Sequence, residues 1–256
     1  MHVNNSGGEP TIVFLHGANA GAWMWNPVLD HMPDVHSLCP DLPGHGRSAT
    51  EDWTTLEEIA DDLATLLRDR CARGRAHIVG LSLGAYLGLV LIDRHPEVVE
   101  SAFLSGVPSK PLPNPRLMRT LGYLMVPFIH TKALLQMNAR ALRIPESQMI
   151  DYVTRSRENS RQAFLKINAQ AIGFTAPNRA LQTPVRKLFV AGSREHPLIR
   201  TSLADFLNRS ERVECYEVEN AGHAWSSEHS ELFAAAVDAW TTGQELPPQL
   251  VPISAA

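Results

Sequence analysis

The stretch AHIVGLSLG, at residues 76–84, places a serine between two glycines where a buried strand pattern ends and an apolar helix pattern begins. It fits the pattern G-x-S-x-G, with Ser82 at its centre. A sharp strand-to-helix turn strains the backbone of such a serine and exposes its hydroxyl, and side chains at the two glycines would collide with neighbouring backbone. A glycine-containing turn that matches by chance is the alternative. The strand before the motif and the helix after it favour a nucleophile at Ser82.

Short β-branched and apolar runs alternate with helical patterns on both sides of this motif. The predicted strands are 11–15, 35–39, 76–80, 101–105, 187–191 and 213–218, and the predicted helices include 54–70, 82–94, 198–207 and 229–240. The alternation predicts an α/β fold, with a mostly parallel sheet of about six to eight strands and helices on both faces. Residues 247–256 show neither pattern, and we expect them to form a loose end.

Residues 108–182 interrupt the alternation. Four of the first eight residues of this segment are proline, no strand pattern follows, and helical patterns dominate. We therefore divide the chain into a core, residues 1–107 and 183–256, and a helical cap (lid), residues 108–182, inserted after the strand at 101–105. Ligands bind at the carboxyl edge of open α/β sheets, and we expect the cap to cover that edge.

A serine hydroxyl needs a base within hydrogen-bond reach, and the base needs an orienting acid. In this kind of architecture the acid and then the histidine follow the serine along the chain. His223 lies in a glycine-containing loop after the last predicted strand, and Glu195 is the only carboxylate in the loop after the preceding strand. We predict that His223 takes the Ser82 proton and that Glu195 fixes the His223 ring and stabilises its cation. Surface loops often carry a solvated glutamate, so the assignment of Glu195 rests on its position.

Two backbone amides are expected to bind the oxyanion that forms during acyl transfer. One is the N–H of Leu83, at the start of the helix that follows Ser82. The other is the N–H of Ala18, in the loop after the first predicted strand, where Gly17 allows a close backbone approach. We expect His16 to make structural hydrogen bonds rather than to react.

The composition excludes several classes of protein. The chain has 256 residues, 44% of them apolar, which is enough for one substantial core, and its net charge of -4 gives no field that favours nucleic acid. Its three cysteines suit free thiols in a reducing compartment, and its histidines lack the spacing of metal ligands. No apolar run approaches the roughly 20 residues that span a bilayer, and residues 1–10 do not resemble a signal peptide. We expect a cytoplasmic protein with a small-molecule substrate and no cofactor, metal, nucleic-acid or membrane partner; the oligomeric state stays open.

Taken together, the motifs resemble the α/β-hydrolase superfamily of serine hydrolases. They are His16-Gly17 followed by Trp23, DLPGHGRS at residues 41–48, the Ser82 turn, Glu195, and Gly222-His223. The resemblance covers nearly the whole chain outside residues 108–182, and it implies that residues 41–48 form a structural loop. Residues 15–23 are similar to the plant methylesterase and hydroxynitrile lyase group. However, Gly17 and Ala224 stand where the lyases of that group carry threonine and lysine.

The sequence predicts a carboxylesterase-type reaction, in which Ser82 forms an acyl-enzyme with an ester of a small, largely apolar substrate. Residues 117–137 are rich in apolar side chains, and we expect Met125 and Phe128, together with Trp23, to contact this substrate. The alternatives are a thioester, a lactone or a carbon–carbon bond as the target, acyl transfer to an alcohol, and a ligand-binding protein without activity.

Charge is unevenly distributed along the chain. Residues 108–182 carry 11 basic and 3 acidic residues, a net charge of +8, and the remaining 12 basic and 24 acidic residues give the rest of the chain -12. One interpretation is that the basic residues are the solvated faces of the cap helices. The other is that they draw an anionic or carrier-bound substrate toward the cleft.

Overall fold

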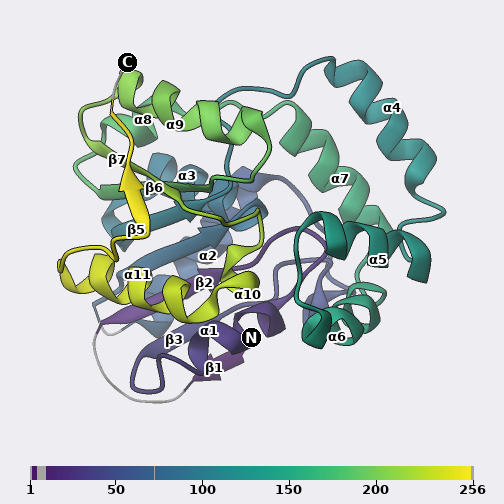
Figure 1. The fold of residues 1–256 in the computed structure, drawn as a ribbon, viewed down its shortest axis with the longest axis horizontal. Coiled ribbons are helices and arrows are strands. Elements are labelled where there is room, and N and C mark those ends of the chain that lie inside the picture. The colour runs from purple at the N-terminus through teal and green to yellow at the C-terminus, as the bar shows by residue number, and fades with distance from the viewer. Residues whose placement is uncertain (1, 5–9, 72, 255–256) are drawn as a thin grey trace.

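The computed structural model describes residues 2–4, 10–71 and 73–254. Its centre is an eight-stranded sheet in the order β1-β3-β2-β4-β5-β6-β7-β8 (Figure 1). The strands from β2 to β7 are parallel, and β1 and β8 pair antiparallel at the two edges. The strands are β1 (His2–Asn4), β2 (Thr11–Leu15), β3 (His36–Cys39), β4 (Ala76–Leu81), β5 (Val99–Ser105), β6 (Arg186–Gly192), β7 (Val213–Val218) and β8 (Leu250–Pro252).

The predicted α/β fold is confirmed, and each of the six predicted strands is present as one of β2 to β7. One expectation was wrong. Residues 247–254 are not simply a loose end, because β8 pairs with β7 and places the buried Leu250 opposite Val218. Residues 255–256 lie outside the described part of the chain. A three-residue strand beside two prolines is too short to show an alternating pattern, so this edge strand depends on its neighbour rather than on its own sequence.

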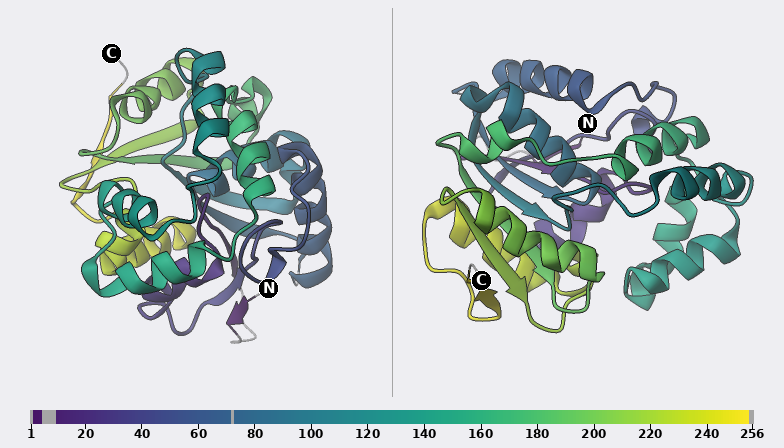
Figure 2. Two further views of the ribbon diagram at one scale, coloured as in Figure 1. Left: turned by 90° about the vertical axis from the view of Figure 1, so that its right-hand side faces the viewer. Right: turned by 90° about the horizontal axis from the view of Figure 1, so that it is seen from above.

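Helices cover both faces of the sheet (Figure 2). Val13 and Leu15 of β2 pack in one hydrophobic core and the alternate residues Ile12 and Phe14 in another, as strand geometry requires. The first core is covered by α2 (Leu56–Arg70), α3 (Leu83–Arg94), α8 (Asn178–Gln182) and α9 (Pro197–Arg209). The second is covered by η1 (Ala22–Trp25), α1 (Asn26–Leu29), α10 (Trp225–Glu228) and α11 (Ser230–Thr242).

Between β5 and β6 the chain forms only helices, in a range that the structure describes in full. Besides α8 these are α4 (Pro115–Met125), α5 (Lys132–Ala141), α6 (Glu146–Ser156) and α7 (Arg161–Ile172), and Figure 1 shows α4 to α7 grouped to one side of the sheet. The α6–α7 connection is bound to the core loops. Asn159 Nδ2 donates to the Ala20 carbonyl at 3.1 Å, and the Ser160 N–H donates to the Gly44 carbonyl at 2.8 Å. The helices are therefore fixed to the loops that follow β2 and β3.

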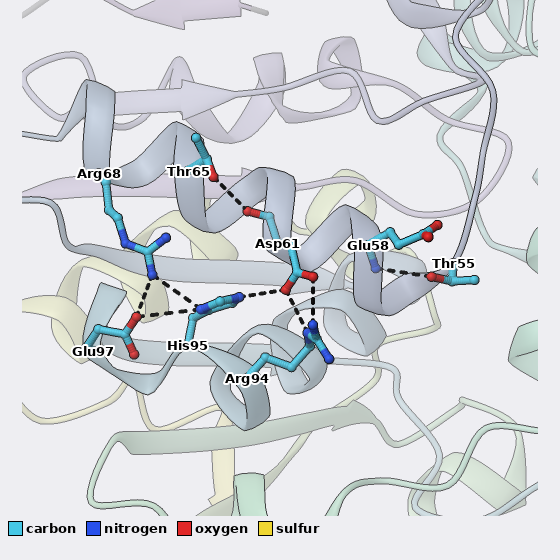
Figure 3. A network of polar contacts seen from close by, with 8 residues as sticks. All are labelled: Thr55, Glu58, Asp61, Thr65, Arg68, Arg94, His95 and Glu97. Carbon is cyan, nitrogen blue, oxygen red and sulfur yellow. Dashed lines mark hydrogen bonds and ion pairs between the residues drawn. The ribbon is translucent and has the colours of Figure 1, made fainter.

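A polar network joins α2 to the end of α3 and to η3 (Pro96–Val98), as Figure 3 shows. Asp61 accepts hydrogen bonds from Nε and a terminal nitrogen of Arg94, both at 2.7 Å, and from His95 Nε2 at 2.7 Å. Arg68 pairs with Glu97 at 2.6 Å. The network holds the C-terminal end of α3, the helix whose other end follows Ser82.

We predict that Asp61 contributes to stability above pH 4 and loses this contribution in acid. Hydrogen bonds from Arg94 and His95 lower the pKa of Asp61 to about 2. A carboxyl group whose pKa is lowered by folding stabilises the fold at pH values above its pKa in the unfolded chain, which is ~4. This stabilisation is lost as the pH falls through the pKa of the group in the folded protein. The Tm of Asp61→Asn should thus lie below wild type at pH 5 to 7 and converge with it toward pH 2. Asp62→Asn, at an exposed neighbour, is the control, and an unchanged Tm gap at low pH would contradict the assignment.

Candidate active site

Ser82 has a backbone conformation that serine rarely adopts. It lies between β4 and α3 with φ 53° and ψ -116°, and its N–H donates to the Ser105 carbonyl of β5 at 2.8 Å. A non-glycine residue in such a region carries a cost on the order of 1–3 kcal/mol that the surrounding structure must offset. Ser82 therefore lies in a strained turn between a strand and a helix, the location that the sequence pattern predicts.

The two glycines around Ser82 are required by close backbone contacts. A Cβ at Gly80 would lie 2.5 Å from the Gly84 carbonyl oxygen, and a Cβ at Gly84 would lie 2.0 Å from the Leu15 carbonyl oxygen. Both distances are far below van der Waals contact, and the clashing atoms belong to the backbone. The sequence prediction that side chains here would collide is confirmed by this geometry.

Glu195 and His223 come from separate loops and form a hydrogen bond. Glu195 follows β6 and is buried, whereas the side chain of His223, which follows β7, keeps 25% of its surface exposed. His223 Nδ1 donates to one carboxylate oxygen of Glu195, and the Gly192 N–H donates to the other at 3.1 Å. Glu195 is thus held from two sides and fixes the tautomer of His223, so that Nε2 is the ring nitrogen that can accept a proton.

The carboxylate also changes the acid–base behaviour of His223. Burial lowers the pKa of His223, but the hydrogen bond and the negative charge of Glu195 outweigh burial and raise it above the usual value. A raised pKa makes the ring a stronger base for a hydroxyl proton.

Gly106 is a site residue that sequence reasoning missed. It follows β5 with φ 72°, and a Cβ there would lie 2.7 Å from His223 Cε1 and 3.1 Å from Glu195 Oε1. The backbone at Gly106 therefore forms the surface against which the Glu195–His223 pair packs. A glycine directly after a buried strand at the carboxyl edge was the available signal.

A cavity of about 230 Å³ joins Ser82 and His223. Its wall is mostly apolar and includes Gly17, Ala18, Ala20, Trp23, Met24, Leu81, Leu142, Ile144 and Ala224, with Asn19, Asn138, Gln148, Tyr152 and Ser227 as polar members. Three of the polar side chains are already engaged, since Asn138 Nδ2 donates to the Tyr152 hydroxyl at 2.6 Å and Gln148 Nε2 donates to the Ser227 carbonyl at 3.4 Å. The cavity suits an apolar group of modest size.

The structure places the three predicted substrate contacts differently. Trp23 lines the Ser82 cavity, whereas Met125 and Phe128 do not. Met125 lines a separate hollow of about 260 Å³, and Phe128 is 55% exposed. This corrects the expected pocket wall. An apolar pattern identifies one side of a helix but not which neighbour that side faces, and here α5 and α6 supply the wall instead of α4.

The predicted oxyanion amides lie near Ser82. Leu83 is the first residue of α3, where a helix leaves N–H groups without internal partners, and Ala18 lines the same cavity as Ser82. A Cβ at Gly17 would lie 3.6 Å from Ser82 Cβ, which shows how close this loop comes. The roles of Ala18 and Leu83 stay predictions.

His16 and Asp41 hold the loops around the cavity. The Leu42 N–H donates to His16 Nε2 at 2.9 Å, and His16 Nδ1 donates to the Gly17 carbonyl at 2.9 Å. Burial and the neighbouring His45 lower the pKa of His16 to about 3, so its ring is neutral and can accept. Asp41 accepts from the Ala22 N–H at 2.7 Å. These contacts connect the loops after β2 and β3 and agree with a structural role for His16.

Glu228 connects the loop that carries His223 to the turn between α5 and α6. One carboxylate oxygen accepts from the N–H of Gly222 at 3.0 Å, and the other accepts from Arg143 Nε at 2.6 Å. Arg143 has φ 63° and lies between Leu142 and Ile144, which both line the cavity. The ion pair therefore fixes the α5–α6 turn relative to the loop that carries His223.

A model of the alpha/beta hydrolase family matches residues 12–236. The chain belongs to the alpha/beta hydrolase family. This alpha/beta hydrolase is similar to an AB hydrolase superfamily protein of Gibberella zeae, 27% identical over 270 residues that cover 95% of this chain and 84% of that protein. It is also similar to esterase Rv0045c of Mycobacterium tuberculosis, 35% identical over 103 residues that cover 40% of this chain and 34% of that protein.

Solved structures resemble this alpha/beta hydrolase over nearly its whole length. A hydrolase from Pseudomonas aeruginosa has a TM-score of 0.80 at 17% identity, covering 94% of this chain and 92% of that chain. An enol-lactonase from Burkholderia xenovorans has a TM-score of 0.78 at 18% identity, covering 94% of this chain and 95% of that chain. The relatives and the family support a hydrolase role. In the part of the chain that the structure describes, no helix is long and apolar enough to cross a membrane.

We predict that Gly106→Ala lowers kcat because its methyl group pushes His223 and Glu195 out of position. A displacement of a catalytic group by ~1 Å costs about 10²-fold in rate. Gly122→Ala is the matched control, since a Cβ at Gly122 meets no atom within 4 Å. Circular dichroism should show both variants folded. A Gly106→Ala variant with wild-type kcat would refute the proposed packing.

Breaking the ion pair between Arg143 and Glu228 should loosen the cavity wall. We expect Arg143→Ala to raise KM about tenfold with little change in kcat, in line with the coupling of a partly buried charged pair. Glu228→Ala should lower kcat as well, because the Gly222 N–H beside His223 loses its acceptor. Arg140→Ala, an exposed arginine of α5, is the control. Equal effects of all three variants on KM and kcat would contradict this division of roles.

Proposed function

We propose that this protein is a serine hydrolase that cleaves the ester bond of a small, largely apolar substrate through an acyl-enzyme on Ser82. The observation that supports this most is the hydrogen bond between His223 and the buried Glu195, on a ring that shares a cavity with Ser82. The positive φ of Ser82 is the second support, because a strained strand-to-helix turn of this kind presents a serine as a nucleophile.

The reaction begins with proton transfer from Ser82 Oγ to His223 Nε2. The serine oxygen attacks the ester carbonyl carbon, and the N–H groups of Leu83 and Ala18 bind the oxyanion. The imidazolium, stabilised by Glu195, then gives its proton to the leaving alcohol as the carbon–oxygen bond breaks. Water activated by His223 repeats the sequence on the acyl-enzyme, which releases the acid and restores Ser82.

The substrate preference follows from the cavity wall. Trp23, Leu142 and Ile144 offer apolar surface, and the cavity of about 230 Å³ limits the size of the group beside Ser82. In this proposal residues 108–182 act as a cap whose α5 and α6 set the acyl preference.

The test is turnover of short p-nitrophenyl esters by wild type and by Ser82→Ala. We expect wild type to release p-nitrophenol and the variant to lose this activity while keeping its Tm. An active Ser82→Ala variant would refute the nucleophile. A folded wild type that turns over no member of a panel of esters, thioesters, lactones and diketones would instead favour a binding protein.

The pH dependence provides a separate prediction for Glu195. His223 must be neutral to accept a proton, so kcat/KM falls as pH drops through the His223 pKa. Because Glu195 raises this pKa, Glu195→Gln should move the acid limb of the profile to lower pH. It should also reduce plateau kcat on the order of 10³–10⁴-fold, since the imidazolium loses its counter-charge. Glu217→Gln, in the neighbouring strand, should leave the limb in place, and an unmoved limb in Glu195→Gln would contradict the role of the acid.

A further inference from the structure

α4 is an amphipathic helix whose apolar side is not covered by the rest of the chain. Figure 1 shows it at the outer margin of the molecule, and none of its residues is buried. Leu117, Leu121 and Leu124 recur on one side and are 53%, 45% and 64% exposed. Met125 at 38% and Phe128 at 55% continue this surface toward α5. We call these five residues the α4 patch. A contiguous exposed apolar patch of this kind marks an interaction surface.

The chain segment that carries the α4 patch is positively charged. Between Glu100 and Glu146 the chain has six basic residues and no acidic residue. Lys110 and Arg143 are engaged in ion pairs with Asp205 and Glu228. Arg116, Lys132 and Arg140 are exposed and form no ion pair with any described residue, and Arg116 lies on α4 itself.

The polar side of α4 carries groups suited to an aqueous boundary. Arg119 and Tyr123 lie on the side of the helix away from Leu117, Leu121 and Leu124. Arg119 donates to the Ala169 carbonyl of α7 at 3.3 Å, which ties α4 to α7, and Tyr123 is 62% exposed. An exposed apolar stripe beside arginine and tyrosine is the pattern of helices that lie in the plane of a membrane interface.

We propose that the α4 patch binds the surface of a bilayer that contains anionic phospholipids. The apolar stripe would enter the boundary between headgroups and acyl chains, while Arg116 and Lys132 meet lipid phosphates. The stripe carries no donor or acceptor that could fix the register of a folded partner, which suits a fluid surface. A two-fold dimer through this patch would bring the same basic residues of both copies together, so charge disfavours a second copy.

This binding mode differs from the sequence expectation of no membrane partner, which considered only spanning segments. It also places Met125 between the membrane surface and a hollow in the protein. Met125 belongs to the α4 patch and lines the hollow of about 260 Å³, whose wall shares Asn19 and Asn138 with the Ser82 cavity. The bound bilayer would therefore lie over a mostly apolar hollow whose wall adjoins the Ser82 cavity at Asn19 and Asn138.

The test is sedimentation of the full-length protein with vesicles of phosphatidylcholine, with and without phosphatidylglycerol, in rising salt. We expect binding to the anionic vesicles only, weakened by salt. Leu121→Asp with Leu124→Asp should weaken binding by at least about tenfold through lost apolar burial. Arg116→Gln and Lys132→Gln should each weaken it about fivefold.

Val251→Asp is the matched control, since Val251 is a 41%-exposed apolar residue on β8. It should leave binding unchanged, and circular dichroism should show every variant folded. No binding, equal binding to both kinds of vesicle, or equal loss in Val251→Asp and the α4 variants would overturn the proposal. A concentration-dependent dimer that Leu121→Asp disrupts would also overturn it and assign the patch to a second copy. None of these readouts uses turnover, so the outcome is independent of the proposed ester hydrolysis.

Discussion

The close packing of backbone around Ser82 is the constraint on which the rest of the structure depends. At Ser82 the chain turns from β4 into α3 so sharply that there is no space for a side chain at Gly80 or Gly84. Ser82 itself adopts φ 53° in this turn. Such a turn costs energy and persists only because β4 pairs with β2 and β5 while α3 packs on the sheet and is held at its far end by Asp61. The hydrophobic core thus offsets the strain that exposes one hydroxyl.

The remaining site groups are positioned by the same edge of the sheet. Parallel strands end together, so the loops after β5, β6 and β7 bring Gly106, Glu195 and His223 side by side although they are far apart in the sequence. The pair works as a unit. Glu195 is held by the Gly192 N–H, and His223 is limited by the backbone at Gly106 and by the loop that Glu228 anchors. Because Glu195 and His223 lie close to the backbone at Gly106, an added methyl group there would change the relative position of the two side chains.

Much of this arrangement could be predicted from the sequence, and the exceptions share one cause. The strands, the Ser82 turn, and the places of Glu195 and His223 follow from local patterns and chain order, which carry their own signals. Met125 and Phe128 were expected beside Ser82, yet the pattern on α4 specifies an apolar side without specifying what it faces. The Arg143–Glu228 pair and β8 depend on contacts between distant segments, which a single sequence does not encode in any local pattern. Gly106 has a local signal, a glycine directly after a buried strand, but its contact with Glu195 and His223 is also long-range.

In the proposed mechanism Ser82 is a nucleophile activated by His223, and covalent labelling measures this directly. Intact-protein and peptide mass spectrometry after treatment with a fluorophosphonate should find one adduct, on Ser82, in the wild type. We expect no adduct in Ser82→Ala and strongly slowed labelling in His223→Ala, because the hydroxyl would lack its base. An unlabelled wild type, an adduct on another residue, or equal labelling rates in wild type and His223→Ala would contradict it.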